Sequence, residues 1–178
     1  MDHAYPEVAI LILNFNCEAF VLDCLKAVLE VRYPPERLKV VLIDNASTDR
    51  SVELVKQFNP KIEIIQNRHN LGICRAYNLA VEAMDAEVIA LLSPDMKVEP
   101  DWLKKLVVPF GSPEPPAATA GRILTWDGTW IDQAGANVSF CGLAWPRTHP
   151  ARMNHEAILA AGSGAMCIRR DIFLDIGI

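Results

Sequence analysis

Two aspartates in this chain directly follow short apolar runs, where they are placed to do chemistry. Asp44 opens the segment DNASTD after LKVVLI, and Asp95 follows VIALL within Ser-Pro-Asp. A carboxylate at such a position can accept hydrogen bonds from a nucleobase or a ribose hydroxyl. It can also hold a divalent cation against phosphates, because Mg²⁺ takes oxygen ligands and often only one or two carboxylates from the protein. Asp44 and Asp95 are therefore candidates for binding a nucleotide and a metal ion.

Both positions also have a purely structural interpretation. Asp44 can shape a turn while Ser47 or Thr48 caps the following helix, a role for which both hydroxyls are suited. Ser-Pro-Asp is equally good as a simple turn. Residue types alone leave the ligand and the turn interpretations of Asp44 open.

The segment NRHNLGICR, residues 67–75, is a third candidate. Arg68 and Arg75 could balance the charge of a diphosphate, and Gly72 would allow the backbone to approach it closely. The same residues fit a tight loop with solvated charges, and residue types alone favour that loop. The chain has no GxGxxG or P-loop pattern, so the standard dinucleotide and triphosphate fingerprints are missing.

The elements that must position these residues alternate between strands and helices. We expect strands at residues 8–13, 38–43, 61–66 and 88–92, and helices at residues 19–31, 51–58 and 73–84 and from about Pro100. This alternation predicts an α/β fold with a mostly parallel sheet, whose ligands bind where the strands end. That rule selects the loops at residues 14–18, 44–49, 67–75 and 93–97.

After residue 110 the pattern changes. GSPEPP, residues 111–116, predicts a turn-rich linker. We expect short strands at residues 117–124, 129–132 and 136–140, a loop at 145–150, an apolar strand at 165–168 and a helix at 170–176.

Composition restricts the class of protein. The 178 residues are 51% hydrophobic and 22% charged, which is ordinary for a globular domain. The net charge of −5 lacks the basic excess with which proteins bind nucleic acid, so we expect no nucleic-acid partner. Five scattered cysteines without CxxC spacing predict neither a disulfide framework nor a zinc site, and favour the cytoplasm. We expect no signal peptide and no transmembrane segment.

Five segments in series carry a resemblance to a known family: VAILILNFN, VVLIDNASTDRSVELV, NRHNLGICRAYNLAV, VIALLSPDMKVEPDWL and GSGAMCIRRDIFLDIG. Together they resemble the family 2 glycosyltransferases, and most of all a rhamnosyltransferase-like subgroup. The resemblance implies a Rossmann-like GT-A fold with a nucleotide-sugar-binding half at residues 1–110. Residues 117–178 would begin the acceptor-side half of the same domain.

The implied reaction moves a sugar from a UDP- or dTDP-sugar to a glycan or lipid-linked acceptor, with inversion. The enzyme would be cytoplasmic, with peripheral association at the inner face of the membrane. Mg²⁺ or Mn²⁺ would be the cofactor, bound by Asp95.

The resemblance also implies roles for individual residues. The residues expected to bind the base and ribose are Asn14, Asn16, Glu18, Asp44, Asn45 and Ser47. The residues expected to face the diphosphate and sugar are Asn70, Gly72, Arg75 and Asn78. The residues expected to line the donor-sugar and acceptor cleft are Gly162, Ser163, Gly164 and Ala165.

The chain departs from the family pattern in two ways. Ser93 stands where a strict DxD motif has its first aspartate, which leaves one carboxylate for the metal. The family's catalytic base lies in an acidic stretch that would follow Ile178, so no base is assigned. We therefore expect this chain to bind the donor without efficient transfer. A catalytically inactive nucleotide-sugar-binding or scaffolding module is the alternative.

Two other classes are disfavoured by the loop after the first expected strand. A phosphate-signalling receiver domain needs an acidic pair there, but this chain has Asn14-Phe15-Asn16. A nucleotidyltransferase of related topology carries a glycine-rich and basic loop at that position. Residues 14–18 have no such loop.

Overall fold

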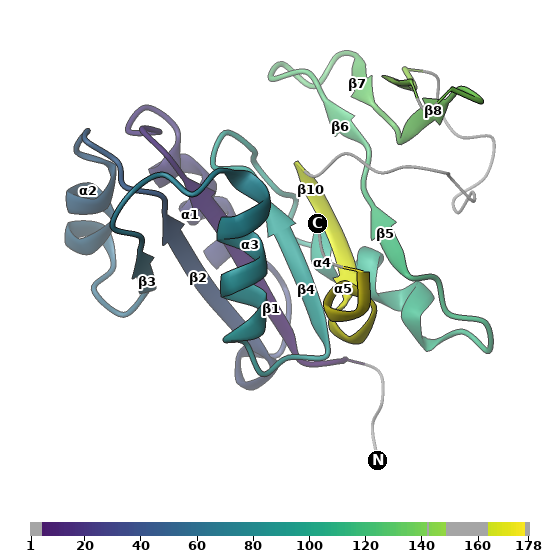
Figure 1. The fold of residues 1–178 in the computed structure, drawn as a ribbon, viewed down its shortest axis with the longest axis horizontal. Coiled ribbons are helices and arrows are strands. Elements are labelled where there is room, and N and C mark those ends of the chain that lie inside the picture. Colours follow the sequence, from purple (N-terminus) through teal and green to yellow (C-terminus); the bar gives the residue numbers. More distant parts are fainter. Residues whose placement is uncertain (1–4, 142, 149–163, 177–178) are drawn as a thin grey trace.

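The computed structural model describes residues 5–141, 143–148 and 164–176. A six-stranded sheet, in the order β3-β2-β1-β4-β10-β5, forms its centre (Figure 1). The parallel strands are β1 (Val8–Asn14), β2 (Leu38–Asp44), β3 (Glu63–Gln66) and β4 (Val88–Leu92). Strand β10 (Ala165–Arg169) is antiparallel to β4, and β5 (Ala118–Ala120) is antiparallel to β10. The α/β fold with a mostly parallel sheet is therefore confirmed.

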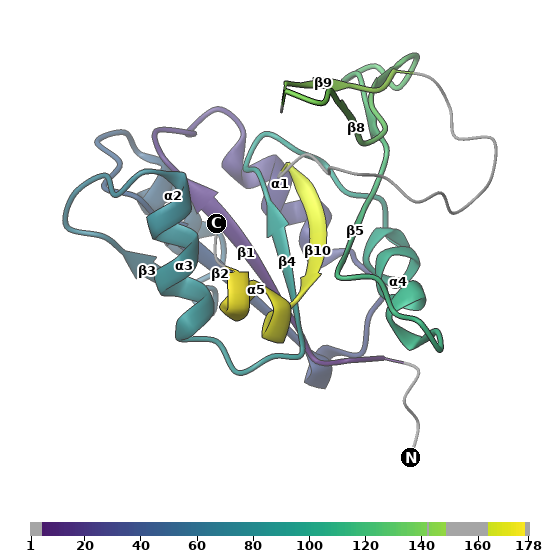
Figure 2. The same ribbon diagram turned by 45° about the vertical axis from the view of Figure 1, so that its right-hand side comes forward.

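Helices cover both faces of the sheet (Figure 2). One buried cluster holds residues of α1 (Val21–Leu29), α2 (Ser51–Phe58) and α4 (Trp102–Val107). The opposite cluster holds residues of α3 (Ile73–Glu82) and α5 (Arg170–Ile176). Short 3₁₀ helices at Pro35–Arg37 and Val108–Gly111 complete the connections.

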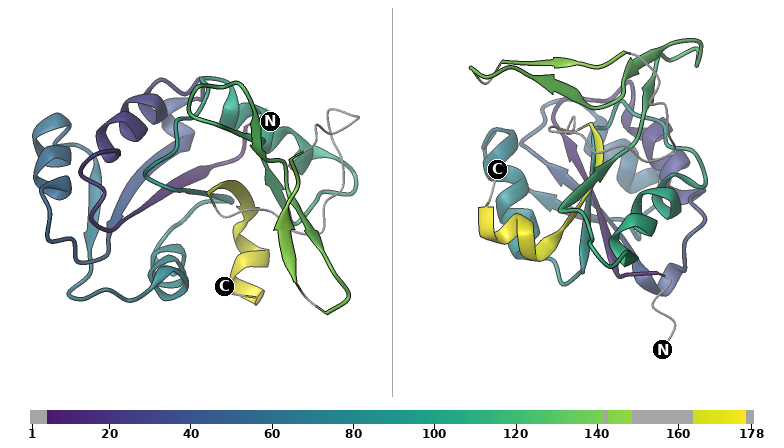
Figure 3. Two further views of the ribbon diagram at one scale, coloured as in Figure 1. Left: turned by 90° about the horizontal axis from the view of Figure 1, so that it is seen from above. Right: turned by 90° about the vertical axis from the view of Figure 1, so that its right-hand side faces the viewer.

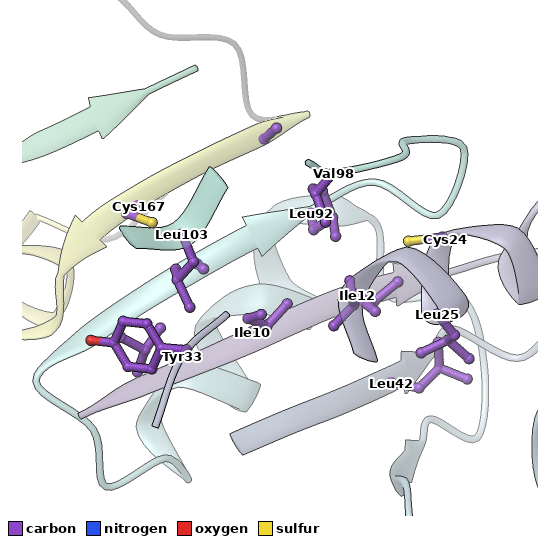
Figure 4. Close-up of a cluster of buried hydrophobic side chains, with 14 of the residues drawn as sticks. Ile10, Ile12, Cys24, Leu25, Tyr33, Leu42, Leu92, Val98, Leu103 and Cys167 are labelled. Atoms are coloured by element: carbon purple, nitrogen blue, oxygen red, sulfur yellow. The ribbon is translucent and has the colours of Figure 1, made fainter. Parts of the chain in front are cut away.

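Both faces of β1 are buried, which explains why its sequence is apolar without interruption. Ile10 and Ile12 face the cluster that contains Leu25 of α1, whereas Leu11 faces the opposite cluster (Figure 4). Alternate side chains of a strand point to opposite faces, so a strand covered on both sides needs apolar residues at every position.

An arm projects from this body (Figure 3). We use that name for residues 121–141 and 143–148. It contains two antiparallel pairs: β6 (Ile123–Leu124) with β7 (Ile131–Gln133), and β8 (Ala136–Val138) with β9 (Ala144–Pro146). The arm lies at the end of the sheet where β1, β2 and β4 terminate (Figure 1).

Several boundaries differ from the sequence prediction. The expected strand at 117–124 is divided into β5 and β6, and the expected loop at 145–150 begins inside β9. Helix α4 begins at Trp102 rather than near Pro100, and α1 is shorter than residues 19–31. Strand β9 exists through its pairing with β8, where Trp145 lies opposite Asn137. Local residue preferences do not reveal such a pairing.

Within the described ranges, no helix is long and apolar enough to cross a membrane.

Candidate functional site

A cleft of about 420 Å³ opens where the parallel strands end. It receives residues from the loops after β1, β2, β3 and β4, as the topology rule predicts. Its volume lies within the range of small-molecule sites, roughly 300–1,000 Å³. The lining residues are Leu13, Phe15, Cys17, Phe20, Asn45, Asn70, Gly72, Ile73, Ser93, Pro94 and Asp95.

Asp95 is exposed at the mouth of this cleft, on a turn that two backbone hydrogen bonds hold. Ser93 N donates to Gly164 O (2.8 Å), and Met96 N donates to Ser93 O (3.1 Å). The first bond joins the turn to the residue that precedes β10. Gly164 therefore lies beside the Asp95 turn, and a Cβ built on it would approach Met96 Cε to 2.9 Å.

The side chains at the cleft fit a divalent cation only if the ligand supplies most of the oxygens. Asp95 is the one carboxylate that lines the cleft in the described part of the chain. That part also contains no group of three or more His, Cys, Asp or Glu residues able to hold a metal. Mg²⁺ commonly binds through one or two carboxylates together with substrate phosphates, so Asp95 suits a cation that a diphosphate accompanies.

Asn14 and Asp44 lie together beneath the cleft, where both are buried. Asn14 Nδ2 donates to Asp44 Oδ1 (3.0 Å) and to Ser51 Oγ (2.8 Å), and lies 2.9 Å from Ser47 Oγ. Ser47 N donates to the other carboxylate oxygen, Asp44 Oδ2 (3.3 Å). These contacts fix the orientation of the Asp44 carboxylate. Neither Asn14 nor Asp44 belongs to the lining of the cleft.

Asn16 and Glu18 join the loop after β1 to the loop after β2. Asn16 Oδ1 accepts a hydrogen bond from Thr48 N (2.8 Å). Glu18 N donates to Asp49 Oδ2 (2.8 Å), and Glu18 Oε2 accepts from Arg50 N (3.1 Å). The two loops are therefore held as one unit.

Asp49 receives enough hydrogen bonds to favour its charged form. Burial acts to raise the pKa of this carboxyl, but bonds from the Ser51 hydroxyl and backbone and from Glu18 N outweigh it and lower the pKa. Asp49 is therefore a charged acceptor that holds the two loops together.

Asn45 links the loop after β2 to the loop after β3. Its Nδ2 donates to Asn70 Oδ1 (2.8 Å), and its Oδ1 accepts from Leu71 N (3.0 Å) and Asn67 Nδ2 (3.1 Å). Gly72 N also donates to Asn70 Oδ1 (2.8 Å). This network places Asn70 and Gly72 at the cleft, immediately before α3.

Gly72 has φ 76° and ψ 168°, a conformation that is essentially restricted to glycine. A Cβ at Gly72 would meet no atom within 4 Å. The backbone conformation, rather than lack of space, requires glycine here.

The remaining predicted residues are not among those that line the cleft. Arg75 is exposed in the first turn of α3, and Asn78 is half-buried one turn further on. Ala165 is buried as the first residue of β10, opposite Leu92. Gly162 and Ser163 lie outside the described residues.

The cleft also has an apolar wall, which the sequence pattern did not predict. Phe15, Phe20 and Ile73 are large exposed hydrophobic residues that line it. Phe15 could have been noticed, because it is an aromatic residue between two asparagines in a polar loop. Cys17 also lines the cleft, and burial raises the pKa of its thiol.

A mostly parallel sheet with a cleft at the carboxyl ends of its strands is the arrangement in which doubly wound α/β proteins bind ligands, nucleotides among them. Comparison with known proteins identifies the family. Residues 9–177 match the family model described as glycosyl transferase family 2, and the chain belongs to this family.

Curated relatives agree with this assignment. Glycosyltransferase AglE of Haloferax volcanii is 27% identical over 143 residues, which cover 79% of this chain and 42% of that protein. The β-monoglucosyldiacylglycerol synthase of Synechocystis is 25% identical over 114 residues, covering 61% of this chain and 24% of that protein. This chain therefore spans less than half the length of either relative.

Solved structures share the fold. The mannosyltransferase PcManGT from Pyrobaculum calidifontis, in complex with GDP-Man and Mn²⁺, matches with a TM-score of 0.71 and 16% identity, over 97% of this chain and 47% of that one. GalNAc-T7 with UDP, GalNAc and Mn²⁺ matches with a TM-score of 0.72 and 16% identity, over 99% and 38%. The Rossmann-like GT-A fold is therefore confirmed.

Proposed function

We propose that this chain forms the donor-binding part of a glycosyltransferase that uses a UDP- or dTDP-sugar. The observation that carries the proposal is one cleft, at the carboxyl ends of four parallel strands, that joins Asp95 to Asn70 and Gly72. The sugar would pass with inversion to a glycan or a lipid-linked acceptor. The resemblance of the sequence to a rhamnosyltransferase-like subgroup makes dTDP-rhamnose one of the donors to test.

The cleft offers a suitable surface for each part of such a donor. Phe15 presents an aromatic face for a base, and the amino end of α3 after Gly72 presents backbone N–H groups to a diphosphate. Asp95 would hold Mg²⁺ or Mn²⁺. When bound, the cation would neutralise charge that develops on the departing diphosphate.

The protein would act in the cytoplasm. All five cysteines are free thiols, which suits the reducing cytoplasm. A lipid-linked acceptor would bring the protein to the inner face of the membrane.

The test is calorimetric titration of UDP, dTDP and GDP, each with Mn²⁺ and with chelator. We expect UDP or dTDP to bind more tightly with Mn²⁺. Asp95→Asn should remove that metal-dependent gain, whereas the control Glu99→Gln, an exposed acid on the same loop outside the cleft lining, should retain it. If no nucleotide binds to folded protein, or if Asp95→Asn keeps the full gain, the donor site is misassigned.

A binding module without transfer activity is the second candidate. It is favoured by the cleft lining, in which Asp95 is the only carboxylate among the described residues. A carboxylate that ligates a metal is not free to deprotonate an acceptor. Sugar transfer by the full-length gene product at saturating donor would exclude the module; donor binding without transfer by that product would support it.

A further inference from the structure

The arm displays aromatic side chains that the donor cleft does not use. Trp126 and Trp130 are 66% and 75% exposed, and Phe140, Leu143 and Trp145 are also at the surface. Large exposed apolar patches on soluble proteins usually mark a binding surface.

Trp126 and Trp130 lie in the β6–β7 turn, which a set of hydrogen bonds holds together. Asp127 accepts hydrogen bonds from Thr125 Oγ1 (2.6 Å) and from the backbone and hydroxyl of Thr129. Gly128 N donates to Thr125 O (2.8 Å), and Thr125 N donates to Trp130 O (2.9 Å). The turn thus satisfies many of its own polar groups and holds the exposed side chains of Trp126 and Trp130 at the surface.

Contacts with the body place this turn near the donor cleft. Lys97 Nζ lies 4.5 Å from the centre of the Trp126 ring. Lys97 is two residues after Asp95, so the ring contacts a side chain from the loop that carries the candidate metal ligand. The arm also lies at the end of the sheet where the cleft opens (Figure 1).

The charge of the arm favours an uncharged ligand. Its described residues contain two arginines, Arg122 and Arg147, and two aspartates, Asp127 and Asp132, so its formal charge is zero. A surface for anionic lipids or for a phosphate is normally rich in basic residues. The C–H groups on one face of a sugar ring carry partial positive charge, and they match the negative face of an aromatic ring.

We propose that Trp126 and Trp130 form a platform on which a neutral saccharide acceptor stacks, beside the Asp95 turn. The inference rests on the proposed glycosyltransferase function and makes it more specific: the acceptor is a saccharide chain rather than a lipid phosphate. Trp126 and Trp130 would bind and position sugar rings and take no part in the bond-making step.

The experiment titrates the 178-residue chain, with and without saturating UDP and Mn²⁺, with cellotetraose, maltotetraose and chitotetraose, followed by NMR. At least one oligosaccharide should bind. Trp130→Ala should weaken its binding about tenfold, the loss expected for one aromatic stacking contact of about 1.4 kcal/mol. Trp130→Tyr should largely restore it, because a tyrosine ring can still stack.

Phe140→Ala is the matched control, since this exposed aromatic residue lies between β8 and β9 rather than on the β6–β7 turn. It should leave oligosaccharide binding unchanged. All three variants should bind UDP as the parent does, because neither Trp130 nor Phe140 lines the cleft.

Any one of three results would contradict the proposal that Trp126 and Trp130 bind a saccharide. One is UDP binding with no oligosaccharide binding. Another is binding of anionic phospholipid vesicles that Trp130→Ala and Phe140→Ala both abolish, without any effect on oligosaccharides; this would identify a membrane surface. The third is a self-associated chain in sedimentation that Trp130→Ala converts to monomer, with no oligosaccharide effect. If the proposed function itself is wrong, the chain will not bind UDP, and this distinguishes that outcome from the three results above.

Discussion

The Asn14 amide donates a hydrogen bond to the Asp44 carboxylate, with Nδ2 3.0 Å from Oδ1 and both residues buried. Asn14 Oδ1 is itself buried and has no hydrogen-bond partner in the described part of the chain. The Asn14 side chain therefore hydrogen-bonds to its neighbours among the described residues through its NH₂ group only. Asn14 thereby positions the loop after β2, which carries Asn45 and Ser47.

Replacing Asn14 tests this support. Asn14→Ala should lower the free energy of unfolding by about 1–3 kcal/mol, because the buried Asp44 carboxylate loses a donor. Urea denaturation measures the change. Asn137→Ala, at an exposed position of β8, should change stability by less than about 0.5 kcal/mol. Equal midpoints for the two variants would show that the amide contributes nothing.

The lowered pKa of Asp49 predicts a pH dependence of stability. A carboxyl whose folded pKa lies below its unfolded value stabilises the fold at neutral pH, and the effect is lost as pH falls below about 4 towards the folded pKa. Asp49→Asn should therefore be less stable than the parent at pH 7, with the difference shrinking at pH 3. Urea titrations at both values measure it, with Asp85→Asn, an exposed acid outside these loops, as the control. A difference that stays constant with pH contradicts the prediction.

Two leucines of α1 offer a matched test of the core. Leu25 is fully buried against the sheet, whereas Leu29, one turn later, is 47% exposed. Leu25→Ala should cost about 2–5 kcal/mol, since it removes buried methyl groups and leaves a cavity. Leu29→Ala should cost less than about 1 kcal/mol. Thermal and urea unfolding of both variants measure the difference. Similar losses of stability in the two variants would show that Leu25 contributes no more to the core than Leu29.

Gly72 gives a prediction about the donor site. Gly72→Ala should destabilise the loop before α3 by roughly 1–3 kcal/mol, because alanine is strained at φ 76°. It should also weaken UDP binding, as the loop relaxes away from its present position at the cleft. Gly111→Ala, where an added Cβ also meets nothing within 4 Å and φ is not positive, is the control. Calorimetry measures the UDP affinity of both variants. An unchanged affinity in Gly72→Ala would show that Gly72 does not contribute to the proposed donor site.

The sequence by itself determined the parallel part of the fold. The bounds predicted for α2 and β4 are those of the structure, and β1 and β2 each end one residue beyond the prediction. Strands β1 and β4 are buried on both faces, so their sequences are almost uniformly apolar and stand out, whereas β2 also carries the exposed Lys39. The polar residues after each strand then located the cleft, because strand ends of a parallel sheet share one edge.

Only the tertiary structure decided what each polar residue does. Asn14 and Asp44 have the same residue types as ligand-binding groups, yet both are buried and hydrogen-bonded to each other, outside the lining of the cleft. Phe15 and Ile73 line the cleft although apolar residues normally avoid water. Strand β10 enters the sheet beside β4 through pairings of Ala165–Arg169 with residues more than seventy positions earlier. Such contacts depend on how distant segments pack, which local periodicity and residue preference do not encode.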